Sequence, residues 1–273
     1  MASGGYWVQL DVRPVRNLRP HEETIESSTR EMVALLTKDG IQKDPIIIDG
    51  TTGVVLDGMH RLSAFGELGL EYAVCCPVDY QSPSISVGRW LRVYKCSGKE
   101  RPRDLAEDVG LTRSSGVSEA LGLLDRKEVS AAVLAGGKAY FPPQQEGSVD
   151  GFKILKAADA AAQSRKWERT FAGEEELENH TGNPSEAVLL VRRFGKDEVL
   201  SAGIKGRLFP CKTSMHTVDP RPVAVNVPLA ELKSGAKETV TKRMFDRHFE
   251  MLPADSVYEG RKYKERLLVL SGK

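Results

Sequence analysis

The sequence lacks the features that mark membrane-bound and secreted proteins. Its longest apolar runs are far shorter than the roughly 20 residues that span a bilayer, and its first residues do not form a secretory signal pattern. Only four cysteines occur, at Cys75, Cys76, Cys96 and Cys211. Cys75 and Cys76 are adjacent, which suits neither a disulfide between them nor a C-x-x-C metal site. We expect four reduced thiols, a cytoplasmic location and no membrane association.

An excess of positive or negative charge is also missing. Lys and Arg number 39 and Asp and Glu number 38, so the net charge is +1 and gives no reason to expect nucleic acid as a partner. The basic clusters at residues 242–243 and 261–264 are interpreted as a solvated face. Neither the G-x-x-x-x-G-K-S/T motif nor the H-R-D and D-F-G pair is present. These absences argue against a P-loop kinase and a protein kinase.

The residues that are present predict an α/β fold. Strands are expected over residues 6–12, 45–49, 54–56 and 72–78, and helices over 23–38 and 58–68, which gives the order β-α-β-β-α-β. Further along, residues 86–94 fit a strand or a helix, and 129–134 with 139–141 fit a hairpin. Helices are expected over 103–110, 117–124, 152–169 and 196–205, strands over 187–193 and 223–227, and loops over 170–184 and 207–216.

One short segment carries a signal for phosphate binding. In L-D-G-M-H-R, residues 56–61, a strand ends at Asp57, Gly58 follows, and a helix starts. Such a junction presents backbone N–H groups and the positive end of a helix dipole. His60 and Arg61 add donors, and Asp57 is a candidate ligand for Mg²⁺. Alone, the segment fits equally well an Asp57 N-cap followed by surface residues.

Three segments together resemble a known family. Residues 45–68, P-I-I-I-D-G-T-T-G-V-V-L-D-G-M-H-R-L-S-A-F-G-E-L, resemble the core of the ParB/sulfiredoxin-like superfamily. Residues 18–22, L-R-P-H-E, resemble the K-P-H-E segment of archaeal free L-serine kinases, and residues 208–216, L-F-P-C-K-T-S-M-H, resemble their F-S-P-K-T-T-R-H segment. The resemblance covers roughly residues 6–232, and the charged tail from Ser234 extends past it.

The resemblance implies a kinase that transfers a phosphoryl group from ADP or ATP, with Mg²⁺, to the hydroxyl of free L-serine in serine and cysteine metabolism. Two positions depart from the family: Met59 replaces a histidine and Met215 replaces an arginine. The choice between ADP and ATP therefore stays open, as does the choice among serine, threonine and homoserine. The expected organisation is a ParB/sulfiredoxin-like nucleotide-binding core at residues 1–98 and a second α/β lobe at 99–273.

The resemblance also assigns roles to residues. Catalysis falls to Glu22, as base for the serine hydroxyl, and to Asp57. Nucleotide and phosphate binding falls to Asp57, Gly58, Met59, His60, Arg61, Lys212, Thr213 and Ser214. Substrate binding falls to Glu22, Trp90 and His216, and metal binding to Asp57. L-serine and an adenine nucleotide are then the partners of a monomer or small homo-oligomer.

Three other interpretations compete with the kinase. A ParB-like nucleotide switch or DNA-binding module would share the core, but no clear helix-turn-helix follows residue 80. A sulfiredoxin-like reductase would need a cysteine in the turn at residues 58–61, where none occurs. A metabolite sensor without activity would keep the same fold.

Overall fold

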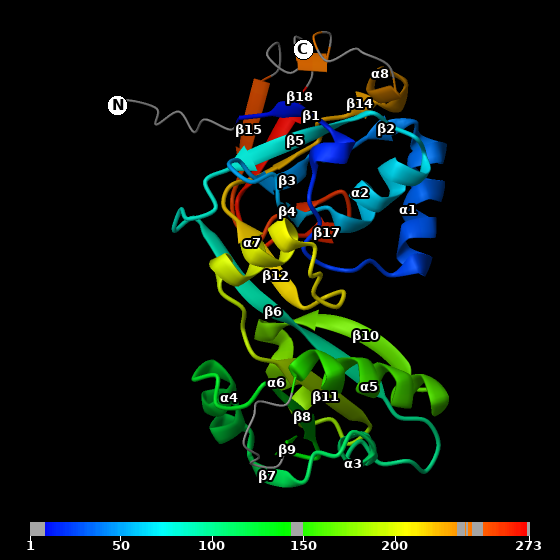
Figure 1. Ribbon diagram of the computed structural model, residues 1–273, viewed down its shortest axis with the longest axis vertical. Helices are drawn as coiled ribbons and strands as arrows, with labels where there is room; N and C mark the ends of the chain where they lie inside the picture. Colours follow the sequence, from blue (N-terminus) through cyan, green and yellow to red (C-terminus); the bar gives the residue numbers. More distant parts are fainter. Residues whose placement is uncertain (1–8, 143–149, 234–237, 239, 242–247, 272–273) are drawn as a thin grey trace. The chain divides into compact units, whose positions relative to one another are not determined.

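The computed structural model describes residues 9–142, 150–233, 238, 240–241 and 248–271, and the chain forms two compact units (Figure 1). The first unit comprises Met1–Ser86, Lys196–Cys211 and His216–Lys273, and the second comprises Val87–Gly195 and Lys212–Met215. This division differs from the predicted boundary at residue 98. It falls earlier because strand β6, Ile85–Lys95, pairs with strands of the second unit, and the chain returns to the first unit at Lys196.

The first unit begins with a four-stranded sheet in the order β1-β5-β3-β4. Its strands are β1 (Asp11–Pro14), β3 (Ile46–Asp49), β4 (Val55–Asp57) and β5 (Tyr72–Val78), with the 3₁₀ helix η1 at Val15–Asn17. Helices α1 (Glu26–Asp39) and α2 (Met59–Glu67) complete the expected β-α-β-β-α-β order, with the two-residue strand β2 (Ile41–Gln42) after α1. β3 pairs parallel with β5 and antiparallel with β4.

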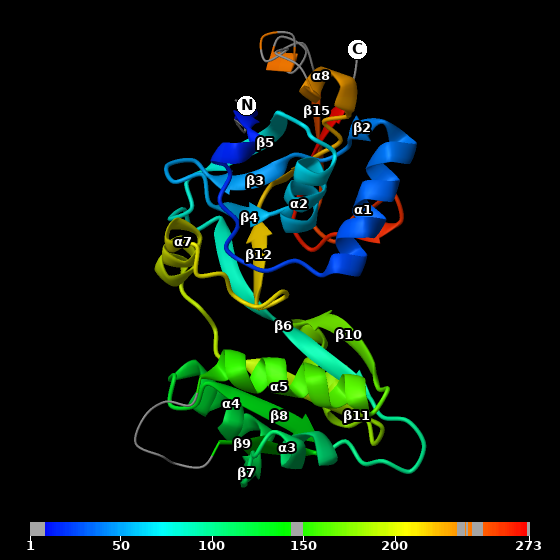
Figure 2. The same ribbon diagram turned by 45° about the vertical axis from the view of Figure 1, so that its right-hand side comes forward.

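Hydrophobic burial explains this arrangement. Ile46 and Ile48 of β3 pack with Phe65 of α2 and Leu36 of α1 in one core, and α1 lies beside α2 (Figures 1 and 2). Every residue of β3 is buried, as a β-branched run covered on both faces requires. Gly40 ends α1 in the left-handed conformation, at a φ of 67°.

The C-terminal part of the first unit adds short elements. These are α7 (Lys196–Lys205), β12 (Ser214–Val218, shared between the units), β13 (Arg221–Val223), β14 (Val227–Pro228), α8 (Leu229–Lys233), β15 (His248–Leu252), β16 (Val257–Tyr258), β17 (Arg261–Lys262) and β18 (Leu267–Ser271). β14 pairs with β2, and β13, β18 and β15 form a three-stranded sheet. The tail therefore contains a buried strand, since Leu267, Leu268 and Leu270 are almost fully buried.

The second unit is built on one large antiparallel sheet in the order β10-β6-β11-β8-β9-β7, with β12 also on β6. Its elements are β6, α3 (Asp104–Asp108), β7 (Arg113–Gly116), α4 (Val117–Asp125), β8 (Ala131–Ala135), β9 (Lys138–Phe141), α5 (Gly151–Ser164), β10 (Glu168–Gly173), η2 (Glu174–Glu176), α6 (Leu177–Thr181) and β11 (Glu186–Val191). α5 packs on one face of the sheet and α4 on the other (Figure 2). The α/β class is thus confirmed.

Several elements differ from expectation. The helix expected to reach residue 169 ends at Ser164, because Lys166 takes a φ of 57°. The loop expected at 170–184 contains the end of β10 and helix α6, because β10 pairs along its length with β6. Left-handed Ala224 and Asn226 split the strand expected at 223–227.

Another difference lies at the N-terminus. The first strand begins at Asp11, and the predicted residues before position 9 lie outside the described part. Residues 242–243 lie outside it as well, so their predicted solvated face is not tested. All four cysteines are free, with Cys75 and Cys76 buried. Among the described residues, helices long and apolar enough to span a membrane are absent.

Candidate active site

The junction between β4 and α2 is a strand–glycine–helix turn. Gly58 has a φ of 103°, and a Cβ there would lie 3.3 Å from Ile46 Cγ1, so glycine is required. The first backbone hydrogen bond of α2 runs from the Leu62 N–H to the Gly58 carbonyl. No side chain caps the helix. The N–H groups of the first turn are thus grouped at the end of β4, where a helix N-terminus favours an anion.

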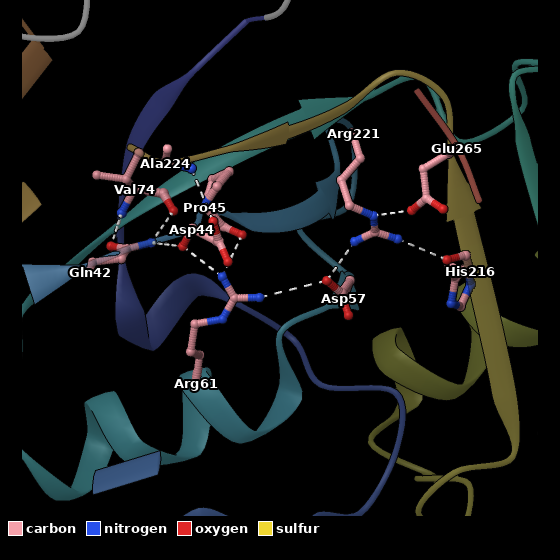
Figure 3. A network of polar contacts seen from close by, with 10 residues as sticks. All are labelled: Gln42, Asp44, Pro45, Asp57, Arg61, Val74, His216, Arg221, Ala224 and Glu265. Atoms are coloured by element: carbon pink, nitrogen blue, oxygen red, sulfur yellow. Dashed lines mark hydrogen bonds and ion pairs between the residues drawn. The ribbon is translucent and has the colours of Figure 1, made fainter. Parts of the chain in front are cut away.

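Asp57 lies at this junction between two arginines (Figure 3). Its Oδ2 accepts a hydrogen bond from Arg221 Nη1 at 2.8 Å and lies 3.6 Å from Arg61 Nη2. Partial withdrawal from water acts to raise the pKa of Asp57, but the charges of Arg221 and Arg61 outweigh it and hold the pKa well below its ordinary value. Asp57 is therefore ionised at neutral pH. None of the described residues hydrogen-bonds to its Oδ1, and the side chain is 42% exposed.

Arg61 holds the main chain as well as Asp57. Its Nη1 donates to the carbonyls of Asp44 and Pro45 at 2.6 and 2.9 Å, and Gln42 Nε2 donates to the same Asp44 carbonyl (Figure 3). A bidentate grip on phosphate by Arg61 would have to use its remaining donors. The predicted phosphate contact of Arg61 stays a prediction, and the structure gives this residue an additional structural role.

His60 and Met59 also have structural roles. The Ile25 N–H at the start of α1 donates to His60 Nε2 at 3.1 Å. Because Nε2 accepts this bond, a neutral His60 carries its proton on Nδ1. Met59 packs against the core of the first unit. Their phosphate-binding roles likewise stay predictions.

Glu22 is buried beside the loop after α7. The Phe209 N–H donates to the His21 carbonyl and the Glu23 N–H donates to the Phe209 carbonyl, both at 2.8 Å. His21 Nδ1 lies 2.6 Å from the Val55 carbonyl, to which it donates, and this leaves Nε2 3.5 Å from Glu22 Oε1. The backbone of residues 21–23 is thus held by Phe209, and the His21 ring beside Glu22 is anchored on β4, the strand that ends at Asp57.

His216 connects Glu22 to Asp57. Its ring centroid lies 5.3 Å from that of His21, its Nε2 lies 2.7 Å from the Tyr80 hydroxyl, and its carbonyl accepts from Arg221 Nη2 at 3.1 Å. Burial, followed by the nearby His21, lowers the pKa of His216 to about 3. At neutral pH His216 is therefore an uncharged imidazole. The first unit thus joins Glu22, His216 and Asp57 in one network, through the His21 ring on one side and through the His216 carbonyl and Arg221 on the other.

The other predicted site residues belong to the second unit. Lys212 Nζ lies over the Trp90 ring, 4.4 Å from its centroid, in a cation–π contact. Thr213 and Ser214 are buried, and Ser214 begins β12 instead of ending a loop. The structure therefore brings Lys212 and Trp90 together. The phosphate contacts predicted for Lys212, Thr213 and Ser214 are not tested by it.

Sequence reasoning missed three members of the network. These are Tyr80, Arg221 and Glu265, which all lie outside the three motif segments, and Arg221 is 164 positions from Asp57. The Arg221 guanidinium binds Asp57, the His216 carbonyl and Glu265 (Figure 3). The only sequence signal near Arg221 is its position between Pro220 and Pro222. This pattern does not predict that Arg221 contacts Asp57 or Glu265.

Asp57 is compatible with a magnesium ion held mainly by a nucleotide. Groups of three or more His, Cys, Asp and Glu that could hold a metal ion are absent from the described part of the chain. Mg²⁺ commonly takes one or two carboxylates and completes its octahedron with phosphate oxygens and water. The open Oδ1 of Asp57 fits that pattern as a single carboxylate ligand.

The fold and the junction define an α/β protein with a candidate anion site at a helix N-terminus, and comparisons give its relatives. An ADP-dependent L-serine kinase of Thermococcus kodakarensis is 25% identical over 237 residues, 83% of this chain and 92% of the relative. An ATP-dependent L-serine kinase of Staphylothermus marinus is 23% identical over 80% of this chain and 89% of the relative. A ParB-like protein of Sulfolobus acidocaldarius is 39% identical over 85 residues, 31% of this chain and 42% of the relative.

A solved structure supports the fold. A free serine kinase variant in complex with AMP superposes with a TM-score of 0.69 at 22% identity, over 82% of this chain and 94% of the other. No family model matches the chain. L-serine kinases are thus homologues of this protein over most of its length, and the resemblance inferred from three short motifs is confirmed.

Proposed function

We propose that this protein is a free L-serine kinase, which transfers the terminal phosphoryl group of ADP or ATP to the hydroxyl of L-serine and forms O-phospho-L-serine. The similarity to L-serine kinases over four fifths of the chain carries the proposal. The connected Glu22, His216 and Asp57 side chains support it from the structure. A role in serine and cysteine metabolism follows from the product.

Glu22 is the proposed base. As the serine Oγ attacks the terminal phosphorus, its proton moves to the Glu22 carboxylate, and the bond from phosphorus to the bridging oxygen of the nucleotide breaks. AMP leaves when ADP is the donor, and ADP leaves when ATP is the donor. The backbone bridge at Phe209 holds Glu22 in place. A positioned base of this kind contributes about 10²–10⁴ to the rate.

The donor phosphates are proposed to lie at the start of α2. The helix N–H groups and Gly58 allow close approach of an anion, and Lys212, Thr213 and Ser214 are proposed as further phosphate ligands by their motif. Trp90 and His216 are proposed to bind serine. His216 would do so as a neutral group, consistent with its lowered pKa.

A divalent cation suits the charge of this site. The positive charges of Arg61 and Arg221 are balanced by those of Asp57 and Glu265, which they contact. A nucleotide would therefore bring its negative charge to a network with no net positive charge. We propose Mg²⁺ at Asp57 Oδ1, where the ion would neutralise the phosphates and withdraw charge from the transferred group.

The remaining features of the proposal come from the sequence. The donor stays ADP or ATP, since relatives of both kinds match the chain. Serine is the proposed acceptor, with threonine and homoserine as analogues to be tested. A cytoplasmic location, a monomer or small homo-oligomer, and the absence of nucleic acid among the partners stay predictions.

The direct test is product formation. The protein is incubated with L-serine, Mg²⁺ and either ADP or ATP, and O-phosphoserine is measured by mass spectrometry. Glu22→Gln should lower kcat about 10²–10⁴-fold, while Glu23→Gln changes the adjacent carboxylate and should have little effect. Asp57→Asn should also lower kcat by orders of magnitude.

Absence of O-phosphoserine with both donors contradicts the proposed function. Full activity of Glu22→Gln would be consistent with a kinase but would show that Glu22 is not its base. The ParB-like DNA-binding alternative predicts a shift of DNA in a gel and no phosphoserine. The homologous kinases favour the kinase over that alternative.

A further inference from the structure

The C-terminal strand β18 lies directly beside the strand that carries Arg221. β13 and β18 pair in parallel, with Arg221 opposite Leu267, and the Arg221 N–H donates to the Arg266 carbonyl at 2.8 Å. Arg266 in turn pairs with Asp219 through Nε and Nη2 at 3.0 and 3.1 Å. These contacts fix residues 265–267, which lie beyond the region of family resemblance, next to the residues that precede β13.

Arg221 is almost fully buried and its guanidinium is held on three sides. Nη1 donates to Asp57 Oδ2 at 2.8 Å, Nη2 donates to the His216 carbonyl at 3.1 Å, and Nε donates to Glu265 Oε1 (Figure 3). The side chains of Arg221 and Glu265 are 8% and 10% exposed, whereas Asp57 is 42% exposed. Glu265 is thus the buried carboxylate partner of Arg221, and Asp57 is the partner that faces outward.

This asymmetry gives Glu265 a specific task. A planar guanidinium held through Nε and Nη2 cannot rotate about its own axis, so Nη1 has a fixed direction. Nη1 then engages Asp57 Oδ2 and leaves Oδ1 turned away from Arg221. Without Glu265, the buried Nε would lose its acceptor. Rotation of the guanidinium to engage both oxygens of Asp57 would then be favourable, because Nε or Nη2 would regain a partner.

We propose that Glu265 is a positioning residue of the phosphoryl-transfer site: it orients Arg221 so that Arg221 holds Asp57 by one oxygen and leaves the other available to the Mg²⁺ ion that would accompany the donor phosphates. The C-terminal tail is then part of the kinase machinery. This inference rests on the proposed function, because it assigns Asp57 to that reaction.

The test compares kcat and KM of Glu265 variants in the full chain with the phosphoserine assay. Glu265→Ala should lower kcat about 10²-fold, since displacement of a catalytic group by about 1 Å has an effect of this size. Serine KM should stay within about threefold, because Arg221 reaches the proposed serine ligand His216 only at its main-chain carbonyl, while Tyr80 still holds the His216 ring. Glu265→Gln keeps an oxygen for Arg221 Nε and should retain most of the activity.

A double-mutant cycle separates positioning from a general loss of structure. Arg221→Ala should lower kcat by a similar factor, and Glu265→Ala should have no further effect in that background, whereas independent effects would multiply to about 10⁴. Glu250→Ala, an exposed carboxylate of β15 in the same sheet, is the matched control and should be neutral. Thermal unfolding shows whether each variant is folded. If Glu265→Ala does not fold, Glu265→Asp takes its place, with an expected fall in kcat of about tenfold.

The outcomes distinguish the two claims. A wild-type protein that forms no phosphoserine contradicts the proposed function and this inference together. An active wild type with an unimpaired, folded Glu265→Ala or Glu265→Asp variant overturns the inference alone. The inference also fails if the losses from Glu265→Ala and Arg221→Ala multiply, or if serine KM rises in step with the fall in kcat.

Discussion

Replacing His216 with glutamine should flatten the acid side of the stability curve of this protein. The side chain of His216 is buried against Tyr80 and His21, and its pKa in the folded state is about 3, against an ordinary value of 6.5. The unfolded chain therefore binds a proton at this residue below pH 6.5, whereas the folded chain does not. The free energy of unfolding is therefore unaffected by this group above pH 6.5, and it falls progressively as the pH falls from 6.5 towards 3.

The size of the effect follows from the two pKa values. One pKa unit corresponds to about 1.4 kcal/mol, so between pH 7.5 and pH 5.0 this group removes about 2 kcal/mol from the free energy of unfolding. Asp57 does not interfere, because its lowered pKa confines its own loss of stability to pH values below about 4. Glutamine keeps polar atoms beside the Tyr80 hydroxyl and does not titrate.

The measurement is urea unfolding of wild type and His216→Gln at half-unit steps from pH 7.5 to pH 5.0. The variant is expected to be less stable at pH 7.5, because it loses ring packing, and to lose about 2 kcal/mol less than wild type over the series. Curves that run parallel from pH 7.5 to pH 5.0 would show that His216 takes up a proton equally in both states. The burial argument for a neutral His216 in the site would then be wrong.

Two further predictions concern the packing of the first unit. Gly203→Ala would place a Cβ 2.8 Å from both Cγ atoms of buried Val54 and should cost about 1–3 kcal/mol of stability. Gly66→Ala in α2 meets open space and should stabilise the protein by up to about 1 kcal/mol. Equal denaturation midpoints for the two variants would contradict this prediction. Arg61→Lys loses the fork that reaches the carbonyls of Asp44 and Pro45 and should cost about 1–3 kcal/mol in urea unfolding, while a change within about 0.5 kcal/mol would show that the carbonyls are satisfied without it.

Local patterns predicted the parts of the fold that local forces determine. The β-branched run at 46–48, Gly40 at the end of α1 and Gly58 before α2 each have a short-range cause, and the corresponding elements occur. β10 was missed because its polar residues become a strand only by pairing with β6. The tail was interpreted by its charge, whereas Leu267 and its neighbours bury β18 against β13.

The candidate site shows the same limit. Glu22, Asp57 and His216 lie in segments with recognisable motifs, and the first unit connects them. Arg221 and Glu265 carry no motif, and their importance arises from contacts across sequence separations of 164 and 44 positions. Such pairings depend on how the strands assemble, so Arg221 and Glu265 could be found only in the structure.

The structural roles within residues 57–61 explain how the segment tolerates Met59 in place of the family's histidine. Gly58 provides the left-handed turn, His60 accepts the N–H at the start of α1, and Arg61 holds two carbonyls beside Asp57. The groups left for the proposed nucleotide are the first N–H groups of α2, which can donate to a phosphate, and Oδ1 of Asp57, the proposed Mg²⁺ ligand. None of them depends on the side chain at position 59. A methionine that packs into the core can therefore occupy that position without altering the turn, and the proposed anion site depends on the backbone that Gly58 and Arg61 hold in shape.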